Sequence, residues 1–216
     1  MPTRHIPFFS NTADGTHCFQ AALRIVLKHF WSNREFLYEE LDKITAKIPG
    51  KWTWPTAAMI WLMEQGFELR LVEDFDYQAF ADRGEQYILE RCGPEVGEAQ
   101  IKNSIISREQ EYAAKFTKIA PLECRIPTFS DLNKYLNDGY LIICNINASS
   151  LYNQPGYSGH FVVVFKCGWR TLTIHDPGLP PKPALTVKKK DFEKAWAYPT
   201  EREKNLLAIR LRQNQK

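Results

Sequence analysis

Apolar residues in the first third of the chain recur at the three- and four-residue spacing of helices that bury one face. The spacing over residues 21–29 predicts a helix that begins close to Cys18. The same reasoning predicts a helix at about residues 36–46 and another that opens at Pro55 and stops at Gly66. The N-terminal part of the chain is therefore expected to be mainly helical.

Short, nearly continuous apolar runs predict strands further along the chain. The runs cover residues 69–72, 141–146, 161–165, 171–175 and 206–211. A short helix capped by Ser130 and Asp131 precedes the later strands, and Gly178 to Pro183 is predicted as a Pro-rich loop. Since turns rather than crossover helices join the later strands, we predict an α+β fold in which an N-terminal helical half packs on a C-terminal antiparallel β-sheet, with a cleft between the halves.

Residues of about 77–120 are predicted to be helical and are highly charged, so we interpret them as an insertion or a lid. The whole chain, residues 1–216, fits a single domain, because it has 44% hydrophobic and 25% charged residues. A chain of this length buries roughly 70% of the surface that its unfolded form exposes, so its core needs neither a disulfide nor a metal.

Charge and cysteine spacing exclude several classes of function. The 28 basic and 25 acidic residues are spread along the chain and leave a net charge of only +3, so no nucleic-acid partner is expected. No apolar run has the length of a membrane span or of a secretory signal, so we expect no membrane partner and a cytoplasmic location. The five cysteines show no C-x-x-C spacing, which predicts neither a disulfide framework nor a metal site.

Cys18, His160 and Asp176 are the candidate catalytic residues. Cys18 begins a helix, where free backbone N–H groups and the helix dipole favour a thiolate. His160 opens the strand at 161–165 and is expected at an exposed sheet end. Reflection across the turn near Gly168 makes Asp176 its cross-strand neighbour, able to orient the imidazole. Two plainer alternatives stay open: Cys18 as a small buried apolar residue, and Asp176 as an ordinary turn residue.

Other histidines and aromatic residues are weaker candidates. His175 should face away from Asp176 by strand alternation, and it is the reserve base if the register is shifted by one residue. His17 is expected to point off the helix start, and His5 and His29 to be surface or satisfied core residues. The aromatic residues that could line a groove are Trp52, Trp54, Trp61 and Tyr157.

Three sequence runs carry a family resemblance. They are Asp14-Gly15-Thr16-His17-Cys18-Phe19-Gln20-Ala21-Ala22-Leu23, Trp54-Pro55-Thr56, and Gly159-His160-Phe161-Val162-Val163-Val164 with His175-Asp176-Pro177. In their order and approximate separation, these runs resemble those of papain-like cysteine peptidases of the bacteriocin-processing, double-glycine leader type, in a standalone form without a transporter. Residues 77–120 lie outside the resemblance.

The resemblance implies a papain-like fold and a catalytic triad. In that triad Cys18 is the nucleophile, His160 the general base and then acid, and Asp176 the residue that orients the imidazole; no cofactor is needed. The leading hypothesis is a thiol hydrolase that cleaves a peptide or other amide bond of a peptide or protein substrate through an acyl-enzyme. Two alternatives stay open: an acyltransferase or transpeptidase with the same triad, and a weak or inactive module that binds a peptide without cutting it.

Two positions depart from the family pattern. Phe19 follows the nucleophile where the family has a small residue, and its ring would either narrow the site or point into the core. The family places an oxyanion-hole glutamine near the position of Thr12. Asn11 can supply the same kind of amide N–H, or it can be a plain turn residue.

Overall fold

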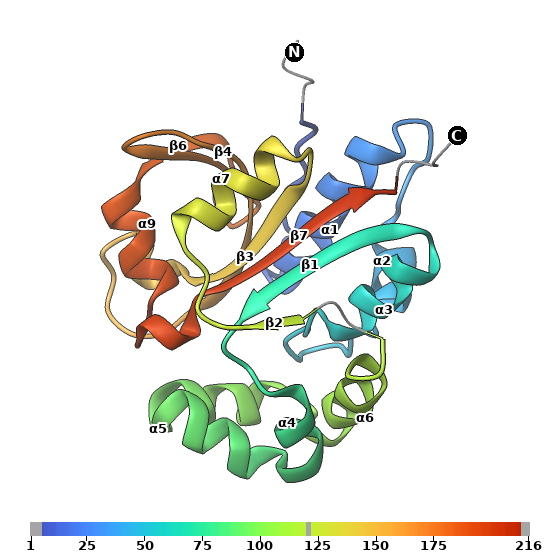
Figure 1. The fold of residues 1–216 in the computed structure, drawn as a ribbon, viewed down its shortest axis with the longest axis vertical. Helices are drawn as coiled ribbons and strands as arrows, with labels where there is room; N and C mark the ends of the chain where they lie inside the picture. The colour runs from blue at the N-terminus through green and yellow to red at the C-terminus, as the bar shows by residue number, and fades with distance from the viewer. Residues whose placement is uncertain (1–5, 120–121, 213–216) are drawn as a thin grey trace.

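The described residues form a seven-stranded β-sheet with helices on both faces (Figure 1). The computed structural model describes residues 6–119 and 122–212. The helices are α1 (Cys18–Phe30), α2 (Tyr38–Ile44), α3 (Thr56–Glu64), α4 (Tyr77–Arg83), α5 (Glu85–Asn103), α6 (Ile106–Phe116), α7 (Phe129–Asn137), α8 (Ala148–Leu151) and α9 (Lys189–Trp196). The strands are β1 (Phe67–Glu73), β2 (Leu122–Cys124), β3 (Leu141–Asn147), β4 (Gly159–Cys167), β5 (Thr171–Asp176), β6 (Lys182–Lys188) and β7 (Asn205–Leu211).

The sheet has the order β2-β1-β7-β3-β4-β5-β6. Its paired strands are antiparallel except for β1 and β2, which are parallel. The last strand, β7, does not lie at an edge but joins β1 to the strands of the C-terminal half. The predicted α+β fold, with helices first and a mostly antiparallel sheet last, is confirmed.

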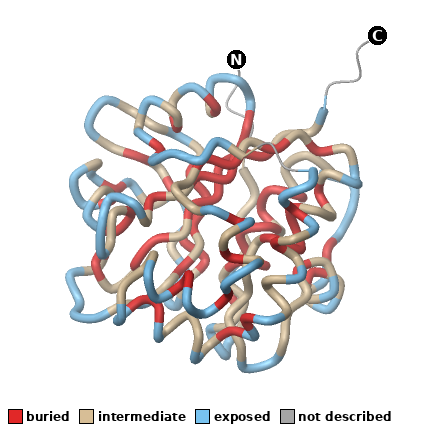
Figure 2. The backbone as a smooth tube through the Cα atoms, turned by 60° about the horizontal axis from the view of Figure 1, so that its bottom comes forward, coloured by how far each residue is buried: buried red, intermediate tan, exposed pale blue. Residues whose placement is uncertain are grey.

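Alternation along the strands divides the interior into two apolar cores. On β3, Ile143 belongs to the core shared with α1 to α6, whereas its neighbour Ile142 belongs to the core shared with α7 and α9. Buried residues accordingly gather in the interior of the molecule in Figure 2, and exposed residues lie mainly at its periphery. Each of the two helical layers packs against one face of the sheet.

Helix α1 lies in the first of these cores and packs directly on β4. Its residues from Phe19 to Val26 include Leu23 and Ile25, whose side chains are fully buried. The Phe19 ring lies 4.8 Å from that of Phe161 on β4. This contact joins the start of α1 to the beginning of the strand that carries His160.

Several local predictions need correction. The N-cap of α7 is Thr128, not Ser130, and Asp131 completes a capping box with it. Part of the predicted Pro-rich loop is the start of β6, which accepts Pro183 because it is an edge strand of the sheet. Helix α9 and the short β2 were not predicted.

Residues 77–116 form α4, α5 and α6, which lie together beyond one end of β1 and β2 (Figure 1). Helix α5 is interrupted at Gly93, where φ is 74°, directly before Pro94. Proline cannot continue the hydrogen-bond ladder of the preceding turn, so the break is expected there. The role of these helices as an insertion or a lid stays a prediction.

Candidate active site

Cys18 is the first residue of α1 and is half-buried. The turn before it is closed by a hydrogen bond of 2.9 Å from Gly15 N to Thr12 O, with Gly15 at a φ of 72°, a conformation that glycine adopts without strain. No side chain caps the helix start. The first backbone N–H groups of α1 are therefore available to an anion at Cys18, as the sequence predicted.

His160 and Asp176 form a buried pair. His160 Nε2 lies 2.6 Å from Asp176 Oδ1, and only 8% of His160 and 2% of Asp176 are exposed to solvent. The prediction that His160 stands at an exposed sheet end is thus wrong. The loop after β5 covers it, since a Cβ atom added at Gly178 would lie 3.2 Å from His160 Nε2.

The strand register also differs from the predicted one. Val163 lies opposite His175, and the pairing shifts at a bulge between Val164 and Lys166. Continued from Val163, this register places Asp176 diagonally from His160 rather than opposite it. A diagonal neighbour on the same face is still within reach of an imidazole, and the two side chains meet.

The Cys18 thiol and the His160 ring interact directly. Burial alone would raise the pKa of the Cys18 thiol, but its hydrogen bond with His160 and the charge of that ring lower it below its usual range. Burial would lower the pKa of His160, yet Asp176 and then the thiol raise it well above its usual value. Because Nε2 is engaged by Asp176, Nδ1 is the ring nitrogen left for Cys18. The pair favours a thiolate beside an imidazolium.

Asp176 has further partners that the sequence analysis missed. Tyr152, directly after α8, donates its hydroxyl to Asp176 Oδ2, and Gly178 N donates to Oδ1 at 2.8 Å. Burial alone would raise the pKa of this carboxyl group, but the hydrogen bond and charge of His160, together with the hydrogen bonds from Tyr152 and Gly178, lower it below its usual range. Asn145 Oδ1 holds the strand backbone in place by accepting from His160 N at 3.1 Å. No local pattern marked Tyr152 or Asn145, because their roles depend on packing.

Asn11 is buried next to this group with a defined amide orientation. Its Oδ1 accepts hydrogen bonds from Thr12 N at 2.9 Å and from His17 N at 2.7 Å. Its backbone N–H donates to Pro177 O at 2.7 Å, one residue after Asp176. Since Oδ1 faces two N–H donors, the amide nitrogen points the other way, and Nδ2 has no hydrogen-bond partner among the described residues. An amide donor is thus left open close to the Cys18 helix start.

The remaining sequence candidates lie outside the group. Phe19 points into the core and is 1% exposed. His175 lies on the opposite face of β5 from Asp176, where its Nδ1 accepts from Ala184 N at 3.0 Å. The ring of His17 contacts Thr12 Oγ1 at 2.7 Å. His29 lies in the last turn of α1, and His5 lies outside the described residues.

A cavity of about 230 Å³ opens beside Cys18 and runs between the sheet and α5. Of the aromatic residues predicted to line a groove, Trp52 and Trp54 line this cavity. Trp61 instead packs on Trp31, and Tyr157 stacks on Tyr198. Trp52 and Trp54 therefore form part of the cavity wall that also includes Cys18. Among residues 6–119 and 122–212, no group of three or more His, Cys, Asp or Glu side chains could hold a metal ion, and no helix is long and apolar enough to cross a membrane.

Comparison with known proteins gives matches at the level of structure. Neither a protein-family model nor a curated protein matches the sequence at a significant level. The peptidase domain of Streptococcus ComA, a bi-functional ABC transporter involved in quorum sensing, superposes with a TM-score of 0.52 at 13% identity, over 96% of this chain and 100% of that one. A protein from Bacillus anthracis named as a C39-like peptidase gives a TM-score of 0.50 at 13% identity, over 98% of both chains. The chain therefore has the fold of the papain-like C39 peptidase domains, as its motifs had indicated.

Proposed function

We propose that the protein is a cysteine peptidase-like hydrolase that cleaves a peptide or other amide bond through an acyl-enzyme on Cys18. The observation that carries the proposal is the shared position of His160, whose ring contacts the thiol at the start of α1 and the buried carboxylate of Asp176. A helix-start thiolate held by an oriented imidazolium is the arrangement that activates a cysteine nucleophile. The C39 peptidase fold of the chain agrees with this chemistry.

In the first half of the reaction, the thiolate of Cys18 attacks the carbonyl carbon and forms a carbon–sulfur bond. The carbonyl electron pair moves onto oxygen, where Asn11 Nδ2 and the Cys18 backbone N–H stabilise the oxyanion. Collapse of this intermediate breaks the carbon–nitrogen bond. The leaving amine takes a proton from the His160 imidazolium, and a thioester remains on Cys18.

In the second half, water releases the acyl group. His160, now neutral, takes a proton from the water as it attacks the thioester carbon. The carbon–sulfur bond then breaks and Cys18 returns to the thiolate, with His160 again protonated. Asp176, held by Tyr152 and Gly178, keeps the imidazole in position through both halves and stabilises its charged form.

The proposal is tested by the pH dependence of Cys18 alkylation with iodoacetamide, followed for each cysteine by mass spectrometry. We expect rapid labelling of Cys18 at pH ~5 to 6, where an ordinary thiol hardly reacts. His160→Ala should abolish this labelling. His29→Ala serves as the matched control, because it removes a histidine from the far end of α1, about 16 Å along the helix. The exposed Cys124 provides the reference thiol.

Labelling of Cys18 only above pH ~8, as for an ordinary thiol, would contradict the proposal and favour a module that binds a peptide without cutting it. If Cys18 is activated, the protein can be acylated with an activated ester. The fate of the acyl group on Cys18 then distinguishes a hydrolase from an acyltransferase or transpeptidase. Release of free acid indicates a hydrolase. Release to an added amine in preference to water indicates an acyltransferase or transpeptidase.

A further inference from the structure

The cavity beside Cys18 contains a carboxyl group that the proposed hydrolysis does not use. Glu73 is the last residue of β1, where it pairs in register with Asn205, and it lines the cavity together with Cys18. Its Oε1 accepts the hydroxyl of Tyr77 at 2.7 Å. Its Oε2 has no hydrogen-bond partner among residues 6–119 and 122–212. One oxygen of this half-buried carboxyl group is therefore open to a ligand in the cavity.

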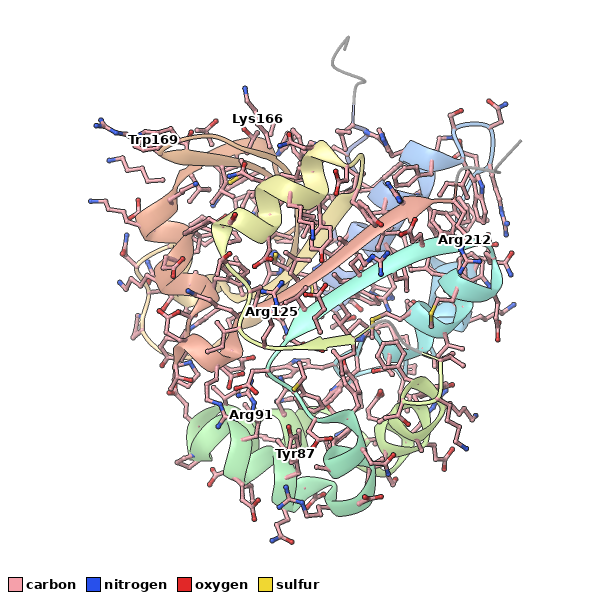
Figure 3. All side chains as sticks on the ribbon, viewed as in Figure 1. Tyr87, Arg91, Arg125, Lys166, Trp169 and Arg212 are labelled. Atoms are coloured by element: carbon pink, nitrogen blue, oxygen red, sulfur yellow. The ribbon has the colours of Figure 1, made fainter. Side chains whose placement is uncertain are left out.

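The nearest cation does not neutralise Glu73. Arg91 reaches from α5 toward the sheet, as Figure 3 shows, and its Nε donates to Asp74 O at 2.7 Å. Its remaining nitrogens bind Glu203 and the carbonyl of Arg202. The guanidinium group of Arg91 thus donates its hydrogen bonds to acceptors other than Glu73.

The second cation on the cavity wall is also paired. Lys204 lines the cavity and forms ion pairs with Glu193 and Glu201. Of the charged residues that line the cavity, Glu73 and Glu203 are acidic and Arg91 and Lys204 are basic, and both cations pair with carboxylates other than Glu73. Glu73 itself forms no ion pair among the described residues, so it is the carboxyl group of the lining that is open to an added cation.

The cavity lining combines apolar and polar side chains. Its apolar part includes Phe161 on β4, Leu207 on β7 and Trp52 before α3, and its polar part includes Gln100, Asn145 and Asn205. A volume of about 230 Å³ is smaller than the roughly 300 Å³ at which pockets for whole small molecules begin, so it suits one side chain. A side chain with an aliphatic stem and a cationic end matches a lining that holds apolar side chains together with a carboxyl group that forms no ion pair among the described residues.

We propose that this cavity is a specificity pocket for a lysine side chain next to the scissile bond, with Glu73 as the residue that binds its ammonium group. This inference rests on the proposed function of Cys18 and names the substrate class: peptides with a basic residue on the acyl side of the cleaved bond. Tyr77 holds the carboxyl group in place through Oε1, and the open Oε2 accepts from the ammonium group. Binding replaces the water on the ammonium group by a charge-assisted hydrogen bond.

The test uses peptidyl chloromethyl ketones, which react with Cys18 when the thiolate displaces chloride and a thioether forms. The probes carry lysine, norleucine or glutamate at the first or the second residue on the acyl side. Norleucine matches the lysine stem without the ammonium group. We expect the lysine probe to label Cys18 about tenfold faster than the norleucine probe at pH 8, a ratio that corresponds to about 1.4 kcal/mol, and the glutamate probe to react slowest.

Glu73→Gln should bring the ratio of the Cys18 labelling rates with the lysine and norleucine probes close to one. Glutamine retains the shape of the glutamate side chain and removes its charge. Glu109→Gln is the matched control. Burial raises the pKa of both Glu73 and Glu109 to about 7, but Glu109 does not line the cavity. We expect the control to keep the wild-type ratio. The comparison of probes on the wild-type protein needs no variant and so does not depend on the folding of Glu73→Gln.

The ratio should also change with pH. Burial holds Glu73 largely protonated below pH 7, whereas Tyr77 and Arg91 favour its ionised form and Glu203 opposes it. Lys204 and Cys92 also line the cavity, and Lys204 is paired with carboxylates other than Glu73. The lysine preference should therefore increase between pH 6 and pH 8. Ionisation of Cys18 affects all probes equally and cancels in the ratio.

The outcomes separate this inference from the proposed function. Iodoacetamide-reactive Cys18 without a lysine preference, or with a preference that Glu73→Gln leaves intact, overturns the specificity pocket and leaves the hydrolase proposal standing. Cys18 that behaves as an ordinary thiol overturns the hydrolase proposal. The probe ratio can then still be measured at alkaline pH, where any thiol reacts, and a preference lost in Glu73→Gln would support the pocket as a binding site.

Discussion

The charge of Asp176 should determine how long His160 keeps its proton as the pH rises. Asp176→Asn isolates this charge. The amide oxygen can still accept from His160 Nε2 and Gly178 N, which now lie 2.6 Å and 2.8 Å from Asp176 Oδ1. The amide nitrogen then replaces Oδ2 beside the hydroxyl of Tyr152, which can turn to accept from it. The variant should keep the geometry and lose one negative charge.

The magnitude follows from the contact between the two groups. With about 4 Å between the centres of charge and an effective dielectric constant of about 20, the imidazolium and the carboxylate attract each other by about 4 kcal/mol. Both side chains are buried, so solvent weakens this attraction little. One pKa unit corresponds to about 1.4 kcal/mol, which sets an upper limit of about three units. Because the amide dipole replaces part of the lost interaction, we expect the pKa of His160 to fall by about one to three units.

The measurement is an NMR titration of the imidazole nitrogens in ¹⁵N-labelled protein, with the His160 signals assigned from their loss in His160→Ala. The wild-type pKa of His160 is raised, so its imidazolium should persist above the usual range, and Asp176→Asn should lose this proton at lower pH. Asp191→Asn makes the same charge change at an exposed position of α9 and should leave the titration unchanged. An unaltered His160 titration in Asp176→Asn would refute the proposed role of Asp176.

Two further variants test the oxyanion donor and a structural cap. Asn11→Asp keeps the acceptor for the two backbone N–H groups but removes the amide donor, so we expect the acylation rate with a p-nitrophenyl ester to fall by about 100-fold or more. An unchanged rate would favour the plain turn-residue alternative. Thr128→Ala removes the capping box of α7 and should lower the free energy of unfolding by about 1 kcal/mol in urea denaturation. Thr128→Ser should retain the stability, and equal losses in both variants would contradict the cap.

Much of the fold could be read from short stretches of sequence. The period of apolar residues located α1 within a residue or two, since each turn of helix depends on neighbours three and four positions away. The runs at 141–146 and 161–165 are strands whose two faces enter different apolar cores, which is why their sequences are nearly continuous in apolar residues. Helix α9, which was not predicted, has the same helical spacing in its buried residues Phe192, Ala195 and Trp196.

Predictions that relied on a partner distant in sequence were less accurate. A reflection about Gly168 placed Asp176 opposite His160, whereas the turn is centred between Trp169 and Arg170. The bulge before Lys166 moves the pairing back by one residue and leaves Asp176 diagonal to His160. The edge position that allows Pro183 in β6 is a property of the whole sheet and has no local signature. Register and strand order depend on which faces pack together, and a single segment does not contain that information.

The position of Cys18 at a helix start and the candidate residues His160 and Asp176 followed from the sequence, because each was marked by its own neighbours. Their meeting was expected only from the family resemblance and from a reflection across a turn, because no local pattern determines it. It requires α1 to pack on β4, a loop to close over the imidazole, and Tyr152 to reach the carboxylate from a separate element. The cavity lined by Glu73 and Cys18 likewise depends on the packing of the sheet against α4 and α5. Local patterns specify elements through short-range sterics and burial, whereas a site depends on side chains that long-range packing brings within a few ångströms.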